Sequence, residues 1–160
     1  QLADVDLLPR IDGLLRQHAL PASDLELEVT ESAAMHNPAG CIAVLQGLRQ
    51  RGVKLAIDDF GTGYSSLAYL RRFPIDQLKI DRSFVQDATV HPDSAAIVHS
   101  IIGLARNLRM QTVAEGVETP EQRAFLLAAG CDLLQGYLFS RPVTADALLE
   151  LVRQHHALPH

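Results

Sequence analysis

The sequence contains no tryptophan, only two cysteines and 5% aromatic residues among its 160 positions. Cys41 and Cys131 are too few and too far apart for a disulfide framework or a zinc knuckle, so we expect two packed, reduced thiols. An excess of basic residues is missing too, because the formal net charge is -5. Such a chain has no broad attraction to a nucleic-acid backbone, and we expect no DNA partner.

Long hydrophobic runs are also absent. The longest apolar stretch, around residues 97–105, is interrupted by His99 and Ser100 and is much shorter than the roughly 20 residues of a membrane-spanning helix. No segment resembles a signal peptide. With 48% apolar and 21% charged residues, residues 1–160 are expected to form a single cytoplasmic domain that does not touch a membrane itself, although a parent protein can be membrane-tethered.

Helical and strand patterns alternate along the chain. Apolar periodicity and capping residues predict helices over 6–20, 37–52, 66–72, 94–108, 119–130 and 144–152, and strands over 25–30, 53–59, 78–81, 112–116 and 133–137. This is a leading helix followed by about five strand-helix units. Strict alternation implies parallel strands, which leaves a doubly wound sheet or a (β/α) barrel.

Polar residues at the strand ends favour the barrel. They follow or close five different strands: Glu28, Asp58, Asp59, Lys79, Asp81, Glu115 and Gln135. In a barrel the carboxyl ends of all strands share one mouth, whereas a doubly wound sheet draws its site from the few strands at the switch point. The sequence therefore predicts an α/β fold that is part of a TIM-like (β/α)8 barrel.

The run from Asp58 to Gly63 has the character of a metal site. Asp58 and Asp59 follow an apolar strand at the point where the backbone stops being pleated, so both carboxylates can turn toward one point, and Gly61 and Gly63 let the chain bend. With Glu28 and Glu115, listed above, these acids suit two Mg²⁺ or Mn²⁺ ions about 3.5 to 4 Å apart, which can clamp a phosphodiester. The alternative for any one acid is a helix cap or a solvated loop charge.

Lys79 lies between Leu78 and Ile80, so its ammonium is expected to point into the barrel mouth. There it either pairs with the site carboxylates or orients an attacking water. An ordinary salt bridge to Asp81 or Asp58 is the structural alternative.

Five stretches of the chain, in the same order, resemble the EAL-type cyclic di-GMP phosphodiesterases, bacterial enzymes that open the cyclic dinucleotide to the linear dimer. The stretches cover residues 27–32, 58–67, 78–81, 113–119 and 135–142. The resemblance implies that Glu28 and Asp58 bind a first metal and that Asp58 bridges to a second one held by Asp59. It also implies that Lys79 positions the hydrolytic water and that Glu115 binds a metal or its water.

The resemblance assigns further residues around the metals. Glu31 and Glu118 are similar to the residues that hold the loop of Gly61 and Gly63 in shape, and Gln135 to a substrate or water contact. Arg141 belongs to the same motif as Gln135, as a substrate contact or as a structural partner of a nearby acid. The family also implies a homodimer that uses the glycine loop region.

Two family features are missing. Neither the Glu-Ala-Leu signature nor the asparagine of the next strand is present, and the chain starts at Gln1. We therefore expect an N-terminally truncated domain, with two ligands of the first metal absent and an upstream sensory or cyclase domain in a parent chain. The expected function is metal-dependent hydrolysis of cyclic di-GMP by the parent, and the alternative is an inactive dinucleotide-binding or protein-interaction module.

Overall fold

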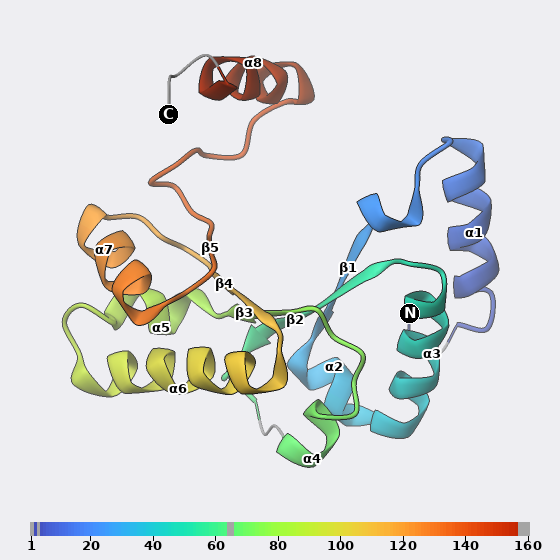
Figure 1. Cartoon of the computed structure of the whole chain (residues 1–160), viewed down its shortest axis with the longest axis horizontal. Helices are drawn as coiled ribbons and strands as arrows, with labels where there is room; N and C mark the ends of the chain where they lie inside the picture. The colour runs from blue at the N-terminus through green and yellow to red at the C-terminus, as the bar shows by residue number, and fades with distance from the viewer. Residues whose placement is uncertain (1, 3, 64–65, 157–160) are drawn as a thin grey trace.

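The computed structural model describes residues 2, 4–63 and 66–156 (Figure 1). Its centre is a five-stranded parallel sheet in which each strand pairs with the next along the chain. The strands are β1 (Glu26–Thr30), β2 (Lys54–Phe60), β3 (Gln77–Ile80), β4 (Gln111–Ala114) and β5 (Leu133–Leu134). This sequential order is that of a (β/α) barrel and differs from the reversing order of a doubly wound sheet. The α/β class and the partial barrel predicted from the sequence are confirmed.

Helices connect the strands. They are α1 (Leu7–Gln17), the 3-10 turn η1 (Ala22–Asp24), α2 (Glu31–His36), α3 (Pro38–Gln50), α4 (Leu67–Leu70), α5 (Arg82–Asp87), α6 (Pro92–Leu108), α7 (Pro120–Ala129) and α8 (Ala145–His156). Two of the α-helices, α2 and α5, were not predicted from the sequence, and neither was η1. Both α-helices are six residues long and begin where a strand ends, capped by Thr30 and Asp81 respectively. A helix of fewer than two turns shows no clear apolar period, which explains why the pattern missed them.

The apolar core lies between the sheet and its helices. Leu55, Ala56 and Ile57 are consecutive in β2 and all fully buried, as expected for a parallel strand that is covered on both faces. In Figure 1, α1 and α3 lie on the side of β1, and α5, α6 and α7 on the side of β5. The core therefore fixes the relative positions of β1 to β4, whose carboxyl ends carry the polar residues.

The last predicted strand is shorter than expected. The sequence predicted residues 133–137, but β5 ends at Leu134. Beyond it, the backbone of Val117 donates to Gln135 O (3.0 Å) and accepts from Leu138 N (3.0 Å), so the chain turns across the loop after β4 instead of continuing along the sheet. A Cβ on Gly136 would lie 2.1 Å from Val117 O, so only glycine permits this approach.

Two features lie at the margins of the sheet. β1 is an edge strand, and a hollow of about 720 Å³ beside it is lined mainly by apolar side chains of α1, β1, α2 and α3.

At the other end of the sheet, Figure 1 shows α8 set apart from the sheet after an extended segment. None of the described helices combines the length and the apolar character that a membrane crossing requires.

Candidate metal centre

A backbone irregularity brings Asp58 and Asp59 to the same side of the sheet. The register between β2 and β3 shifts between Ile57 and Phe60, and Asp59 has a left-handed backbone with φ of 53°. Consecutive strand residues normally point to opposite faces, and a bulge with a left-handed residue removes that alternation. One oxygen each from Asp58, Asp59 and Glu115 consequently lie within 4.8 Å of one another.

Lys79 lies at the centre of a second set of carboxylates. Its Nζ is 2.7 Å from Glu28 Oε1, 3.0 Å from Asp58 Oδ1 and 2.8 Å from Glu115 Oε1. These acids come from β1, from β2 and from the residue after β4. The pairing with several site carboxylates is thus the arrangement found, and the described ion pairs of Lys79 do not include Asp81. Burial alone would favour the neutral amine, but the hydrogen bonds to Glu115 and Glu28 and the Asp58 carboxylate outweigh it and raise the pKa of Lys79.

The donor set fits a divalent cation. Asp58 Oδ1 is enclosed, and its close partner among the described residues is the ammonium of Lys79 at 3.0 Å. A buried carboxylate oxygen is costly unless a cation compensates it. Oxygen ligands of this kind are the ones that Mg²⁺ and Mn²⁺ prefer. Glu28, Asp58, Asp59 and Glu115 are the residues that would hold such ions.

Asp81 is a further acid at this mouth, which the sequence indicated only as a strand-end acid and as an alternative partner of Lys79. Burial, together with the charges of Asp58 and Asp81, raises the pKa of Asp59. Asp81 itself caps α5, where its carboxylate accepts from Ser83 N (2.9 Å) and from the Ser83 hydroxyl. The Asp-x-Ser spacing after a predicted strand is the signal that could have indicated this cap. The mouth therefore contains more negative charge than the described lysine neutralises.

The glycine loop after β2 is attached to β1 and α2 through Glu31. This side chain is only 1% exposed, and its Oε2 accepts from Gly61 N at 2.8 Å and from Gly63 N at 3.4 Å. The structure thus places Glu31 where the sequence predicted a residue that supports the loop. Glu118, predicted for the same task, makes no hydrogen bond with the described part of the loop and instead lines the cavity described next.

A cavity of about 530 Å³ opens beside the carboxylates. Its lining combines Asp59, Asp81 and Glu115 with Arg82 at the start of α5 and with residues from the turns after β4 and β5, namely Gly116, Glu118, Gln135, Gly136 and Tyr137. Gln135 is therefore next to the acids, as predicted. Arg141 is outside this lining, exposed, with its guanidinium 4.7 Å from the ring centre of Tyr137.

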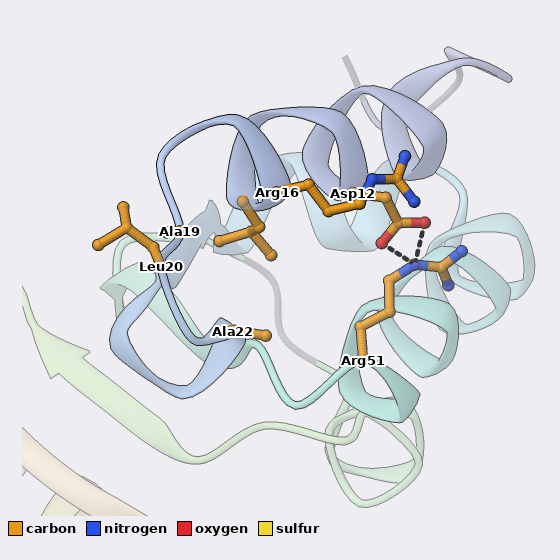
Figure 2. Close-up of a pocket in the computed structure, with 7 residues that line it drawn as sticks. Asp12, Arg16, Ala19, Leu20, Ala22 and Arg51 are labelled. Atoms are coloured by element: carbon orange, nitrogen blue, oxygen red, sulfur yellow. Dashed lines mark hydrogen bonds and ion pairs between the residues drawn. The ribbon is translucent and has the colours of Figure 1, made fainter.

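A different hollow, of about 370 Å³, lies between α1, η1 and the end of α3 (Figure 2). Arg51 Nε donates to both carboxylate oxygens of Asp12, at 2.9 and 3.1 Å, and Arg51 Nη1 donates to Gly47 O at 2.8 Å. Ala22 and Arg51 precede β1 and β2, so this hollow is at the amino ends of the strands, opposite the carboxylates. Since Asp12 and Arg51 are paired with each other, we interpret the hollow as a structural contact between α1 and α3.

The fold and the site define the chain as a segment of a (β/α) barrel with a cluster of carboxylates, suited to a divalent cation, at the carboxyl ends of its strands. Comparison with known proteins gives the family. The chain belongs to the EAL domain family, whose family model matches residues 1–142.

Among curated relatives, the cyclic di-GMP phosphodiesterase NbdA of Pseudomonas aeruginosa is 51% identical over 154 residues, which are 96% of this chain and 20% of NbdA. The cyclic di-GMP phosphodiesterase RocR of the same species is 43% identical over 94% of this chain and 38% of RocR. The chain therefore spans only a fifth to two fifths of the length of these relatives.

Comparison with solved structures gives proteins of the same kind. The PaMucR phosphodiesterase in complex with c-di-GMP has a TM-score of 0.90 and 47% identity over 92% of this chain and 60% of that one. The Klebsiella pneumoniae BlrP1 complex with manganese and the cyclic dinucleotide has a TM-score of 0.81 and 39% identity over 88% of this chain and 36% of that one. Both structures hold the cyclic dinucleotide, and the second holds a divalent metal as well.

Proposed function

We propose that this chain carries the metal-binding and substrate-binding part of a cyclic di-GMP phosphodiesterase, which hydrolyses the cyclic dinucleotide to the linear one with two Mg²⁺ or Mn²⁺ ions. The observation that carries the proposal is the convergence of Glu28, Asp58 and Glu115, from three separate strand ends, on one point in a chain of the EAL family. In the relatives and structures described above, this family hydrolyses or holds the same dinucleotide.

In this proposal the four carboxylates divide between two ions. Glu28 and Asp58 hold the first, and Asp58 bridges to the second, which Asp59 also holds. Glu115 holds an ion or its water. When bound, divalent ions supply an activated water at neutral pH and neutralise the charge of the phosphodiester. The left-handed backbone of Asp59, which sets both carboxylates of the pair on one side, supports this division.

The remaining residues bind and orient. Lys79 positions the attacking water, Gln135 contacts the substrate or a water from the cavity wall, and Arg141 contacts the substrate or is a structural partner of a nearby acid. Glu31 and Glu118 hold the loop of Gly61 and Gly63 in shape. Glu31 does so through direct hydrogen bonds, and Glu118 acts from the wall of the neighbouring cavity. The cavity of about 530 Å³ beside the acids supports a small-molecule substrate of this size class.

The test is hydrolysis of cyclic di-GMP with Mg²⁺ or Mn²⁺, by the longest natural protein that carries this sequence and by the 160-residue chain, with product separated by chromatography. Asp58→Asn and Glu28→Gln are expected to lower turnover of the active protein by about a hundredfold or more, while Lys54→Met, at an exposed position of β2, leaves it unchanged. Tight binding of the dinucleotide without any linear product would contradict the enzyme and establish the alternative, a dinucleotide-binding module.

We also infer a homodimer formed through the glycine loop region and an upstream sensory or cyclase domain in a cytoplasmic parent protein. Leu67 follows the loop and is 61% exposed, with exposed Tyr69 on the same short helix, which supports an apolar contact at this position. Light scattering after chromatography tests the dimer: Leu67→Glu is expected to shift a dimer to monomer, whereas Leu148→Glu on α8 is the control. An unchanged dimer in Leu67→Glu would place the contact elsewhere.

A further inference from the structure

The ammonium group of Lys79 is located where the carboxylates of the metal centre meet. Three oxygens, one each from Glu28, Asp58 and Glu115, lie 2.7 to 3.0 Å from a single Nζ atom. Two of these acids, Asp58 and Glu115, also belong to the cluster whose oxygens can hold an ion. Mg²⁺ needs carboxylate oxygens at about 2.0 to 2.1 Å, so an ion held by these acids would lie close to the ammonium, and the two cations would repel each other.

Lys79 is well suited to stay in this position. Its side chain is only 7% exposed, and Leu78 and Ile80 on either side are fully buried, so the β3 backbone is fixed. Three carboxylates directed at one point repel each other when no cation lies between them. The ammonium compensates that repulsion through close contacts with all three carboxylates.

We propose that Lys79 is a resident cation: it holds the carboxylates together in the metal-free protein, and metal binding displaces it from them. This inference rests on the metal centre of the proposed function and adds a second role to Lys79. Loading the centre then requires that the ammonium leave its three carboxylate partners. The displaced ammonium enters the mouth, where the proposed substrate phosphate and the attacking water lie.

The first test compares Lys79→Met with Lys54→Met, which changes the other lysine of the chain, at an exposed position of β2. In EDTA, Lys79→Met is expected to melt roughly 5 °C or more below the wild type, because three carboxylates lose their cation. Calorimetric titration with Mn²⁺ should show about tenfold tighter binding to Lys79→Met, since no ammonium competes. Lys79→Arg keeps the charge and is expected to restore the wild-type melting temperature in EDTA. Lys54→Met should match the wild type in both measurements.

A second measurement avoids the possible misfolding of a variant. Labelling the wild-type protein with ζ-¹⁵N-lysine gives one signal from Lys79 and one from Lys54. In EDTA, the Lys79 ammonium should exchange its protons slowly, because it is buried and hydrogen-bonded. On addition of Mg²⁺ its signal should shift and exchange faster, while the Lys54 signal stays in place.

The outcomes separate the two claims. Equal Mn²⁺ affinity of Lys79→Met and wild type, or a Lys79 signal that ignores saturating Mg²⁺, overturns the resident cation and leaves the metal centre intact. Binding of Mn²⁺ to Lys79→Met alone supports the resident cation. Binding to neither protein overturns the metal centre, and the resident cation with it.

Discussion

Removing the carboxylate of Glu31 is expected to loosen the glycine loop without unfolding the sheet. Glu31 is almost fully buried and accepts hydrogen bonds from the backbone amides of Gly61 and Gly63, which are exposed. The side chain is therefore a fixed acceptor for a loop that otherwise lies in water. The change to test is Glu31→Ala, with Glu31→Gln as a graded variant that keeps one oxygen acceptor but loses the charge.

The magnitude follows from the two hydrogen bonds that Glu31 accepts from the described residues of the loop. The bond from Gly61 N, at 2.8 Å, is a good bond to a charged acceptor, and such bonds contribute about 1.5 to 3 kcal/mol. The bond from Gly63 N, at 3.4 Å, is close to the distance limit and adds little. Opening of the loop should therefore become easier by about 2 kcal/mol in Glu31→Ala, a factor of about 30, and by about 1 kcal/mol in Glu31→Gln.

Hydrogen exchange measured by NMR reports this opening directly. The Gly61 amide should exchange about 30 times faster in Glu31→Ala than in the wild type, while amides of β3 keep their protection. Ser32→Ala, at the exposed neighbouring position of α2, is the matched control and should leave Gly61 unchanged. Equal Gly61 exchange in Glu31→Ala and wild type would refute the reasoning, since the loop would then be held by other contacts.

Three further predictions concern stability in urea. Gly136→Ala places a Cβ 2.1 Å from Val117 O and should lower the free energy of unfolding by about 3 kcal/mol. Gly103→Ala in α6 has open space around it and should raise the free energy of unfolding by about 0.5 to 1 kcal/mol. Similar urea midpoints for the two variants would contradict the packing described. Thr119→Ala removes the acceptor of Gln122 N in the capping box of α7 and should cost about 1 kcal/mol, and no loss would mean that the cap is not needed. Burial raises the pKa of the Cys131 thiol, so this thiol ionises first in the unfolded chain, and the free energy of unfolding falls as the pH rises above about 8.5. Cys131→Ala should reduce the slope of the free energy of unfolding against pH in this range. An identical slope in the variant and the wild type would exclude Cys131 as its source.

The sequence predicted the longer elements well because their signals are local. The capping box of Thr119 and Gln122 and the glycine at 130 marked α7, and the structure confirms both ends of that helix. The apolar period from Ile97 to Leu108 marked α6 in the same way. In contrast, α2 and α5 are too short to show a period, and the early end of β5 depends on Val117, which is close to Gly136 only in the folded chain.

The composition of the site was predictable, whereas the pairing of Lys79 with the site carboxylates was predictable only as one of several alternatives. Acids at strand ends can be recognised in the sequence, because parallel strands bring their carboxyl ends to one mouth. The three partners of Lys79 come from positions 28, 58 and 115, and only the register of the sheet decides which acids reach its ammonium. The left-handed backbone conformation of Asp59 could not be predicted from the sequence either, since aspartate adopts it only occasionally.

The bulge at Asp59 also separates the shape of this mouth from its charge. Asparagine tolerates a left-handed backbone about as well as aspartate does, whereas β-branched residues do not. An asparagine at position 59 would therefore keep the bend of β2 and the path of the glycine loop while it removes one carboxylate from the cluster. Under the proposed function, this single substitution would remove a ligand of the proposed second metal without changing the fold, so it would favour dinucleotide binding over hydrolysis.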